Sequence, residues 1–168
     1  MAIRPVVRLP HHVLVAVSAV TDPEDATLAD LAADLVDTMR VSPGCVGLAA
    51  PQIAVGLRVF ALDVTGHRKA RSCAGLVVLA DPVVVSATDP EVAREGCMSV
   101  PDLTGNVARP SRVTVRGTDL LNGGQREVEA DAIEARALLH EIDHLDGLVF
   151  LDRVRSARQD VFTRKTYQ

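Results

Sequence analysis

The sequence predicts an α+β fold, with antiparallel β-sheets packed around a central C-terminal helix that carries H-E-x-x-H and one amphipathic helix near the N-terminus. Apolar residues recur at helical spacing over residues 28–39 and again over 133–145. Between these two stretches, several short segments alternate apolar and polar side chains, as half-buried strands do. A length of 168 residues fits one domain, covering residues 1–168.

The N-terminal helix is expected to begin at Asp22, whose side chain can cap it, with Pro23 in its first position. One apolar stripe consists of Leu28, Leu31, Leu35 and Met39. Residues 43–44, Pro-Gly, should end the helix. We expect this helix to pack on a sheet and to have no chemical role.

Strands are expected at residues 57–64, 75–79, 83–86, 112–117, 125–129 and 148–151. Asn122-Gly123 is a strong tight-turn signal, so the segments on either side of it should form a hairpin. The last dozen residues are polar and basic, which predicts a solvated tail.

The C-terminal helix carries the clearest chemical pattern, because residues 139–147 read L-H-E-I-D-H-L-D-G. His140 and His144 lie one turn apart on the same face of a helix, so two imidazoles can reach one metal ion. Glu141 is offset by roughly 100° and could accept a proton from a water held by that metal. Gly147 suits the left-handed end of the helix. The alternative is an ordinary helix with two unrelated histidines.

Two further segments are unusual. Residues 45–52, C-V-G-L-A-A-P-Q, combine small side chains that let another backbone approach closely with the amide of Gln52. They could also be a tightly packed loop before a strand.

Cys97 follows Gly96 and can present a thiolate, a strong ligand for zinc and iron. A buried free cysteine is the alternative.

Composition excludes several classes of protein. The net charge of −4 gives no electrostatic reason for direct nucleic-acid binding, and no apolar run is long enough to span a membrane. Three cysteines cannot form a complete disulfide framework, which fits a reducing compartment. The apolar residues 13–17 faintly resemble a signal peptide, but Pro10 and two histidines interrupt the pattern. We therefore expect a cytoplasmic protein.

Together, three segments resemble the peptide deformylase family. That family carries G-x-G-L-A-A-x-Q, E-G-C-L-S and H-E-x-x-H-L-x-G in this order, and the matching segments here are residues 45–52, 95–99 and 140–147. Residues 9–14 lack the acidic residue and the arginine that the family often has there, and three single positions also depart from the pattern. Cys45 replaces the first glycine, Met98 replaces a leucine of similar volume, and Leu139 stands where glutamine is common.

The resemblance implies a hydrolase that removes the formyl group from the N-terminal formylmethionine of newly made peptides and releases formate. It implies one divalent metal held by Cys97, His140 and His144, with water in the fourth position. An open fourth position is typical of catalytic sites. The family usually uses Fe²⁺, with Zn²⁺, Ni²⁺ or Co²⁺ as substitutes, and these ligands accept any of them.

The resemblance also implies roles for other residues. Glu141 would act as the general base, while the Gln52 amide and the backbone N–H of Met98 would stabilise the oxyanion. Arg109 would pair with Glu95 and support the cysteine segment.

The substrate would be held by an apolar pocket and by backbone pairing. Val46, Ile133 and Ala137 are expected to form walls of a pocket for the methionine side chain. The rest of the peptide could add as a strand against the backbone of Val46-Gly47 or of Gly96. Plain core packing is the alternative role of the three apolar side chains.

Three other functions stay open at this point. H-E-x-x-H also serves zinc endopeptidases, but these need a third ligand, usually downstream, and no His or Cys follows Gly147. The chain could instead be a deformylase-like binding protein without catalysis, or hold a structural metal, although structural sites usually have four protein ligands. Nascent chains are the expected partners, and the ribosome surface is a further candidate.

Overall fold

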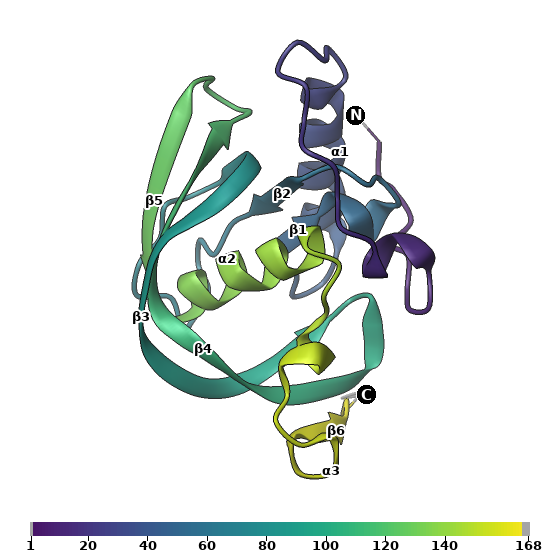
Figure 1. Cartoon of the computed structure of the whole chain (residues 1–168), viewed down its shortest axis with the longest axis vertical. Coiled ribbons are helices and arrows are strands. Elements are labelled where there is room, and N and C mark those ends of the chain that lie inside the picture. Colours follow the sequence, from purple (N-terminus) through teal and green to yellow (C-terminus); the bar gives the residue numbers. More distant parts are fainter. Residues whose placement is uncertain (1, 166–168) are drawn as a thin grey trace.

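The computed structural model describes residues 2–165 and has the expected α+β architecture (Figure 1). Three short 3-10 helices are labelled η. In chain order the elements are η1 (His12–Val15), α1 (Leu28–Val41), β1 (Gly47–Ala49), η2 (Ala50–Ile53), β2 (Val59–Leu62), β3 (Val77–Cys97), β4 (Val100–Asp119), β5 (Gln125–Asp131), α2 (Ala132–Leu145), η3 (Phe150–Arg153), α3 (Ala157–Asp160) and β6 (Val161–Thr163). All six strands belong to one antiparallel sheet of order β1-β2-β3-β4-β5, in which β6 pairs with β4. Within residues 2–165, no helix is long and apolar enough to cross a membrane.

Helices α1 and α2 pack on opposite faces of the β1–β2–β3 part of the sheet. Strand β2 shows this, since all four of its residues are buried. Phe60 and Leu62 join the core with α2, whereas Val59 and Ala61 join the core with α1. Successive side chains of a strand point to opposite faces, so a strand covered on both sides is apolar throughout. The ribbon of β3, β4 and β5 curves around the other side of α2, which leaves this helix at the centre (Figure 1).

Strands β3 and β4 are much longer than the sequence predicts. They form one continuous hairpin of 21 and 20 residues, which turns at Met98-Ser99. The predicted strands 75–79 and 83–86 stop on either side of Asp81-Pro82, but in the structure the register only shifts next to Asp81, whose φ is 49°, and the pairing then continues. Bulges of this kind absorb residues that would otherwise end a ladder. The turn of the hairpin carries Cys97 to the side of α2.

The start of α1 differs from the prediction. The helix begins at Leu28 rather than beside Asp22. The side chains of Asp22 and Asp25 instead accept hydrogen bonds from the backbone N–H groups of Glu24 and Thr27. Such local bonds compete with a helical backbone. The predicted apolar stripe is nevertheless confirmed, because all four of its residues are buried.

One prediction for the C-terminal segment is wrong, and another is incomplete. Residues 148–151 do not form a strand, because the side chain of Asp152 accepts a hydrogen bond from the backbone of Val149 at 2.8 Å and the chain turns into η3. The tail is solvated as expected, since none of residues 157–165 is buried, but as far as residue 165 it also folds back as α3 and β6 along β4. Its residues 166–168 lie outside the part of the chain described. The turn around Asn122-Gly123 and the left-handed Gly147 are confirmed.

Candidate metal centre and active site

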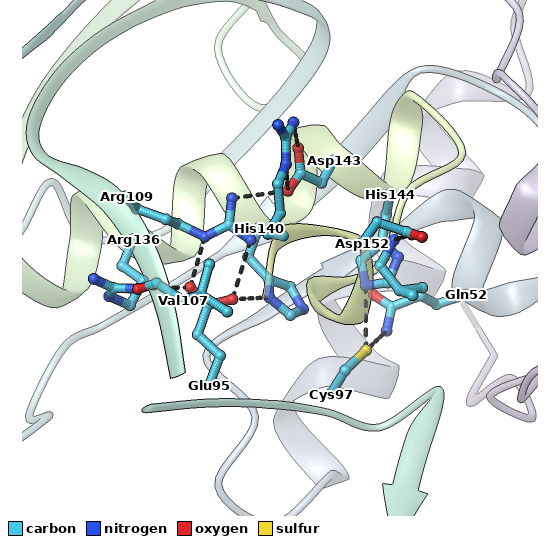
Figure 2. Close-up of polar contacts among 12 residues, drawn as sticks. Gln52, Glu95, Cys97, Val107, Arg109, Arg136, His140, Asp143, His144 and Asp152 are labelled. Carbon is cyan, nitrogen blue, oxygen red and sulfur yellow. Dashed lines mark hydrogen bonds and ion pairs between the residues drawn. The ribbon is translucent and has the colours of Figure 1, made fainter. Parts of the chain in front are cut away.

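Three side chains from two distant parts of the chain meet beside α2. Cys97 lies at the end of β3, and His140 and His144 lie one turn apart on α2. Their candidate ligand atoms lie within 4.8 Å of one another, and Cys97 Sγ is 3.2 Å from His144 Nε2 (Figure 2). Ligand atoms around one four-coordinate ion with bonds of about 2.0–2.3 Å lie about 3–4 Å apart. The spacing and the donor set therefore fit a single divalent metal.

Glu95 fixes the orientation of the first histidine. Its Oε2 lies 3.0 Å from His140 Nδ1, which leaves Nε2 as the nitrogen available to a metal. Arg109 donates from Nε to Glu95 Oε1 at 2.6 Å, so the predicted pairing of these two residues is confirmed, and Arg136 donates to the same oxygen at 2.8 Å. Burial acts to raise the pKa of Glu95, but the hydrogen bonds from His140 and Arg109 outweigh it and lower this pKa to about 2. Glu95 is therefore a carboxylate at neutral pH.

The same network continues along α2 towards its C-terminal end. Arg109 also donates from Nη1 to Asp143 Oδ2 at 2.8 Å (Figure 2). Arg153 donates to both oxygens of Asp143. The roles of Arg136, Asp143 and Arg153 were not predicted from the sequence. One signal was present, since Asp143 lies inside the histidine motif and Arg136 stands four residues before His140, on the same helix face.

We expect Arg109→Ala to weaken both the metal site and the fold. Removing this cation leaves the buried carboxylates of Glu95 and Asp143 with fewer partners, which costs about 3–5 kcal/mol when a buried pair is broken. Metal affinity should fall roughly 10–100-fold, as it does when a group that orients a ligand is lost. Chelator competition and denaturant unfolding measure the two effects. Arg112→Ala is the control, since Arg112 is an exposed arginine on the same strand. Unchanged metal retention would refute the supporting role.

Glu141 is buried next to the two histidines, with 4% of its surface exposed. Its Oε2 has no hydrogen-bond partner among residues 2–165. Burial raises the pKa of this carboxyl to about 7. On its other side lies the backbone of Gly47 in β1, where an added Cβ would stand 2.5 Å from Glu141 Oε1. Position 47 therefore accepts only glycine while Glu141 keeps this place.

We expect Gly47→Ala to lower kcat about 100-fold, because the methyl group would displace the Glu141 carboxylate, and displacements of about 1 Å can cost that much. Metal content should be unchanged, since no ligand moves. Gly56→Ala is the matched control, because a Cβ there meets no atom within 4 Å. Formate release and metal analysis of both variants provide the measurements. Full activity of Gly47→Ala would contradict the argument.

Gln52 approaches the metal cluster from η2 and is 2% exposed. Its Oε1 accepts a hydrogen bond from the backbone of Ala49 at 3.0 Å, which turns its Nε2 donor towards Ser99 Oγ at 3.3 Å and Cys97 Sγ at 3.5 Å. Figure 2 shows the contact between Gln52 and Cys97. Met98 lies in the turn between β3 and β4 and lines a cavity next to the metal cluster. Both residues predicted to stabilise an oxyanion therefore lie beside the cluster.

A cavity of about 370 Å³ opens next to this cluster. All residues predicted to bind substrate line it, namely Val46, Gly47, Gly96, Ile133 and Ala137. His67 also lines it. Cys45 is a further wall, and its thiol donates to the carbonyl of Gly47 at 3.0 Å. Burial, with the nearby charge of Glu141, raises the pKa of this thiol to about 12, so Cys45 stays protonated and outside the ligand set.

A thiolate, two imidazoles and a buried glutamate beside a cavity fit the class of metal-dependent hydrolases. The polypeptide deformylase family model matches residues 3–160. The chain belongs to this family.

Individual peptide deformylases are also similar to this chain in sequence and in structure. A peptide deformylase of Rhizobium meliloti is 39% identical over 165 residues, which cover 98% of this chain and 92% of the relative. One from Bartonella tribocorum is 38% identical with the same coverage. A crystal structure of a peptide deformylase from Legionella pneumophila has a TM-score of 0.83 and 35% identity, covering 94% of this chain and 89% of that one. The enzyme from Ehrlichia chaffeensis in complex with actinonin has a TM-score of 0.84 and 29% identity, covering 94% and 92%.

Proposed function

We propose that this protein removes the formyl group from the N-terminal formylmethionine of newly made peptides, with a divalent metal held by Cys97, His140 and His144. The observation that carries this assignment is the cluster of these three side chains next to Glu141, in a chain that matches the deformylase family almost from end to end. The reaction is hydrolysis of the formyl C–N bond, and its products are formate and a free amino terminus.

When bound, the metal would polarise the formyl carbonyl and make a water acidic enough to attack near neutral pH. Glu141 accepts the proton of the attacking water and returns it to the departing amine. A carboxyl whose pKa lies near 7 suits both transfers. The Gln52 amide and the backbone N–H of Met98 donate hydrogen bonds to the oxygen that becomes negative in the transition state.

The cavity walls determine how the substrate lies. The methionine side chain packs against Val46, Ile133 and Ala137, which line the cavity. The following residues extend along the backbone of Gly47 and Gly96 as an added strand. This places the formyl carbon over the cluster and leaves the rest of the peptide at the mouth of the cavity.

Formate release from formyl-Met-Ala-Ser by anaerobically purified protein with its metal retained tests the proposal. We expect turnover that a chelator removes and added Fe²⁺, Zn²⁺, Ni²⁺ or Co²⁺ restores. A peptide with an internal methionine and a blocked amino terminus tests the endopeptidase alternative, and it should stay intact. A metal-loaded protein that binds formyl peptides without releasing formate would support the non-catalytic alternative.

The wider setting is also a proposal. We infer that residues 1–168 act as a single catalytic domain in the cytoplasm, with Fe²⁺ as the resident ion. Nascent chains are the substrates, and the ribosome surface is a candidate docking partner. The match to the deformylase family supports this setting. Metal analysis of the protein purified anaerobically from its own source tests the choice of ion.

A further inference from the structure

Two arginines at the mouth of the cavity have no part in the mechanism above. Arg94 comes from β3 and Arg164 follows β6, and both line the cavity. Neither forms an ion pair with an acidic residue in the described part of the chain, whereas the cavity arginine Arg136 is held by Glu95. Two positive charges in the cavity wall therefore have no acidic partner among residues 2–165.

The C-terminal strand builds this surface. Phe162 of β6 and Gly96 of β3 both pair with Thr104 of β4, so the three residues form a row across the sheet. The guanidinium of Arg94 stacks on the ring of Phe162, with 3.6 Å between Cζ and the ring centroid. Arg94 is also held by bonds to Asn106 Oδ1 at 2.9 Å and Thr104 Oγ1 at 3.2 Å. Its position is therefore fixed by neutral groups alone.

Arg164 continues the pairing of β6, since its backbone donates to the carbonyl of Asp102 at 2.8 Å. Its side chain crosses to the hairpin turn, where Nη2 donates to the carbonyl of Cys97 at 3.2 Å. The guanidinium lies so close over Gly96 that a Cβ at position 96 would collide with it. Its Nε is buried and has no partner among residues 2–165. A buried, unpartnered donor on a charged side chain calls for an acceptor.

The acidic residues that line the cavity do not supply this hydrogen-bond acceptor. Glu95 is already bound by Arg109, Arg136 and His140. Glu141 lies beside Gly47, and no ion pair links it to the two arginines. An acceptor for Arg94 and Arg164 therefore has to arrive with the ligand.

We propose that Arg94 and Arg164 form a carboxylate-binding subsite that favours formylated peptides with an acidic group in the residues after methionine. This deepens the proposed function and depends on it for the position of the peptide over Gly96. Arginine is suited to the role, because its planar donors match the two oxygens of a carboxylate. The carboxylate could belong to an aspartate or glutamate side chain or to the C-terminus of a short peptide, and the test separates these sources.

The test compares kcat/KM of the metal-loaded protein for matched peptides. Formyl-Met-Asp-Ala-amide and formyl-Met-Ala-Asp-amide are set against the same peptides with Asn, and formyl-Met-Ala-Ala is set against its amide. We expect an acid-to-amide ratio of about five for at least one pair, the size of a partly exposed ion pair, expressed in KM and reduced by salt. The pair that shows it identifies the source of the carboxylate.

Variants distinguish a subsite from a purely structural contact. Arg164→Gln should bring the ratio close to one, and Arg94→Gln should lower it too. Arg158→Gln removes the same charge from an exposed position on α3 that does not line the cavity, so it should keep the wild-type ratio. If Arg164 only fastened the tail to Cys97, Arg164→Gln would slow acidic and neutral peptides alike. Equal rates for acids and amides in the wild type would overturn the proposal.

A binding measurement keeps this inference separate from the proposed function. Calorimetry with the deformylated peptides Met-Ala-Asp-amide and Met-Ala-Asn-amide, and with the corresponding pair carrying Asp or Asn after methionine, needs no turnover. Tighter binding of an acidic peptide, lost in Arg164→Gln, would support the subsite even if no formyl peptide were hydrolysed, and the proposed function alone would then fail. Equal binding of acids and amides would count against the subsite.

Discussion

Replacing Glu141 by Gln is expected to lower kcat about 10²–10⁴-fold, the range that a general base contributes. The carboxylate is buried, unpartnered at Oε2 within residues 2–165, and next to the two histidines, so no other side chain there can replace it. KM should change little, since Glu141 is not expected to bind the resting peptide. Stability should be unchanged or higher, because the variant removes the cost of burying a charge.

Formate release, metal analysis and thermal unfolding check these three expectations. Glu129→Gln is the matched control, since Glu129 is exposed on β5 and should be inert in all three measurements. The informative failure is a Gln variant with wild-type kcat and full metal content. That result would remove Glu141 from the proton transfers and leave its burial unexplained.

Replacing Cys97 by Ala should abolish both metal retention and turnover. It leaves only His140 and His144, and two imidazoles cannot hold an ion against a chelator as well as three ligands can. We expect metal affinity to fall at least about 100-fold, since losing only an orienting partner of a ligand costs up to that much. The fold should persist, because Cys97 adds only a small buried side chain to a cluster that includes Val107 and Phe150.

Cobalt substitution gives this variant a specific signature. A thiolate bound to Co²⁺ produces a charge-transfer absorption band, which Cys97→Ala should lose while the circular dichroism of the fold stays intact. Cys73→Ala is the control, since Cys73 is free, exposed and outside the cluster, and it should keep the band. Persistence of the band in Cys97→Ala would mean that another thiol is the ligand, with Cys45 in the cavity wall as the candidate.

The sequence by itself determined the features that depend on neighbours along the chain. The spacing of His140 and His144 sets both imidazoles on one face of α2, and Gly147 ends that helix, because helical geometry repeats every 3.6 residues. The apolar stripe of α1 was predicted for the same reason. The turn at Asn122-Gly123 was predicted because Asn and Gly tolerate the positive φ of tight hairpin turns. The segments around Gln52 and Cys97 were identified through their order and their resemblance to a family, since nothing local says what they approach.

The tertiary structure decided everything that depends on pairing between distant elements. Strands β3 and β4 run through positions that read as breaks, because each strand supplies the hydrogen-bond partners of the other. A buried charge is stable only when other groups bind it, and these can come from distant parts of the chain. Glu95 accordingly accepts hydrogen bonds from Arg109 of β4 and Arg136 of α2. The C-terminal tail forms β6 because its backbone pairs with residues 103–105 of β4. That pairing is what carries Arg164 to the cavity.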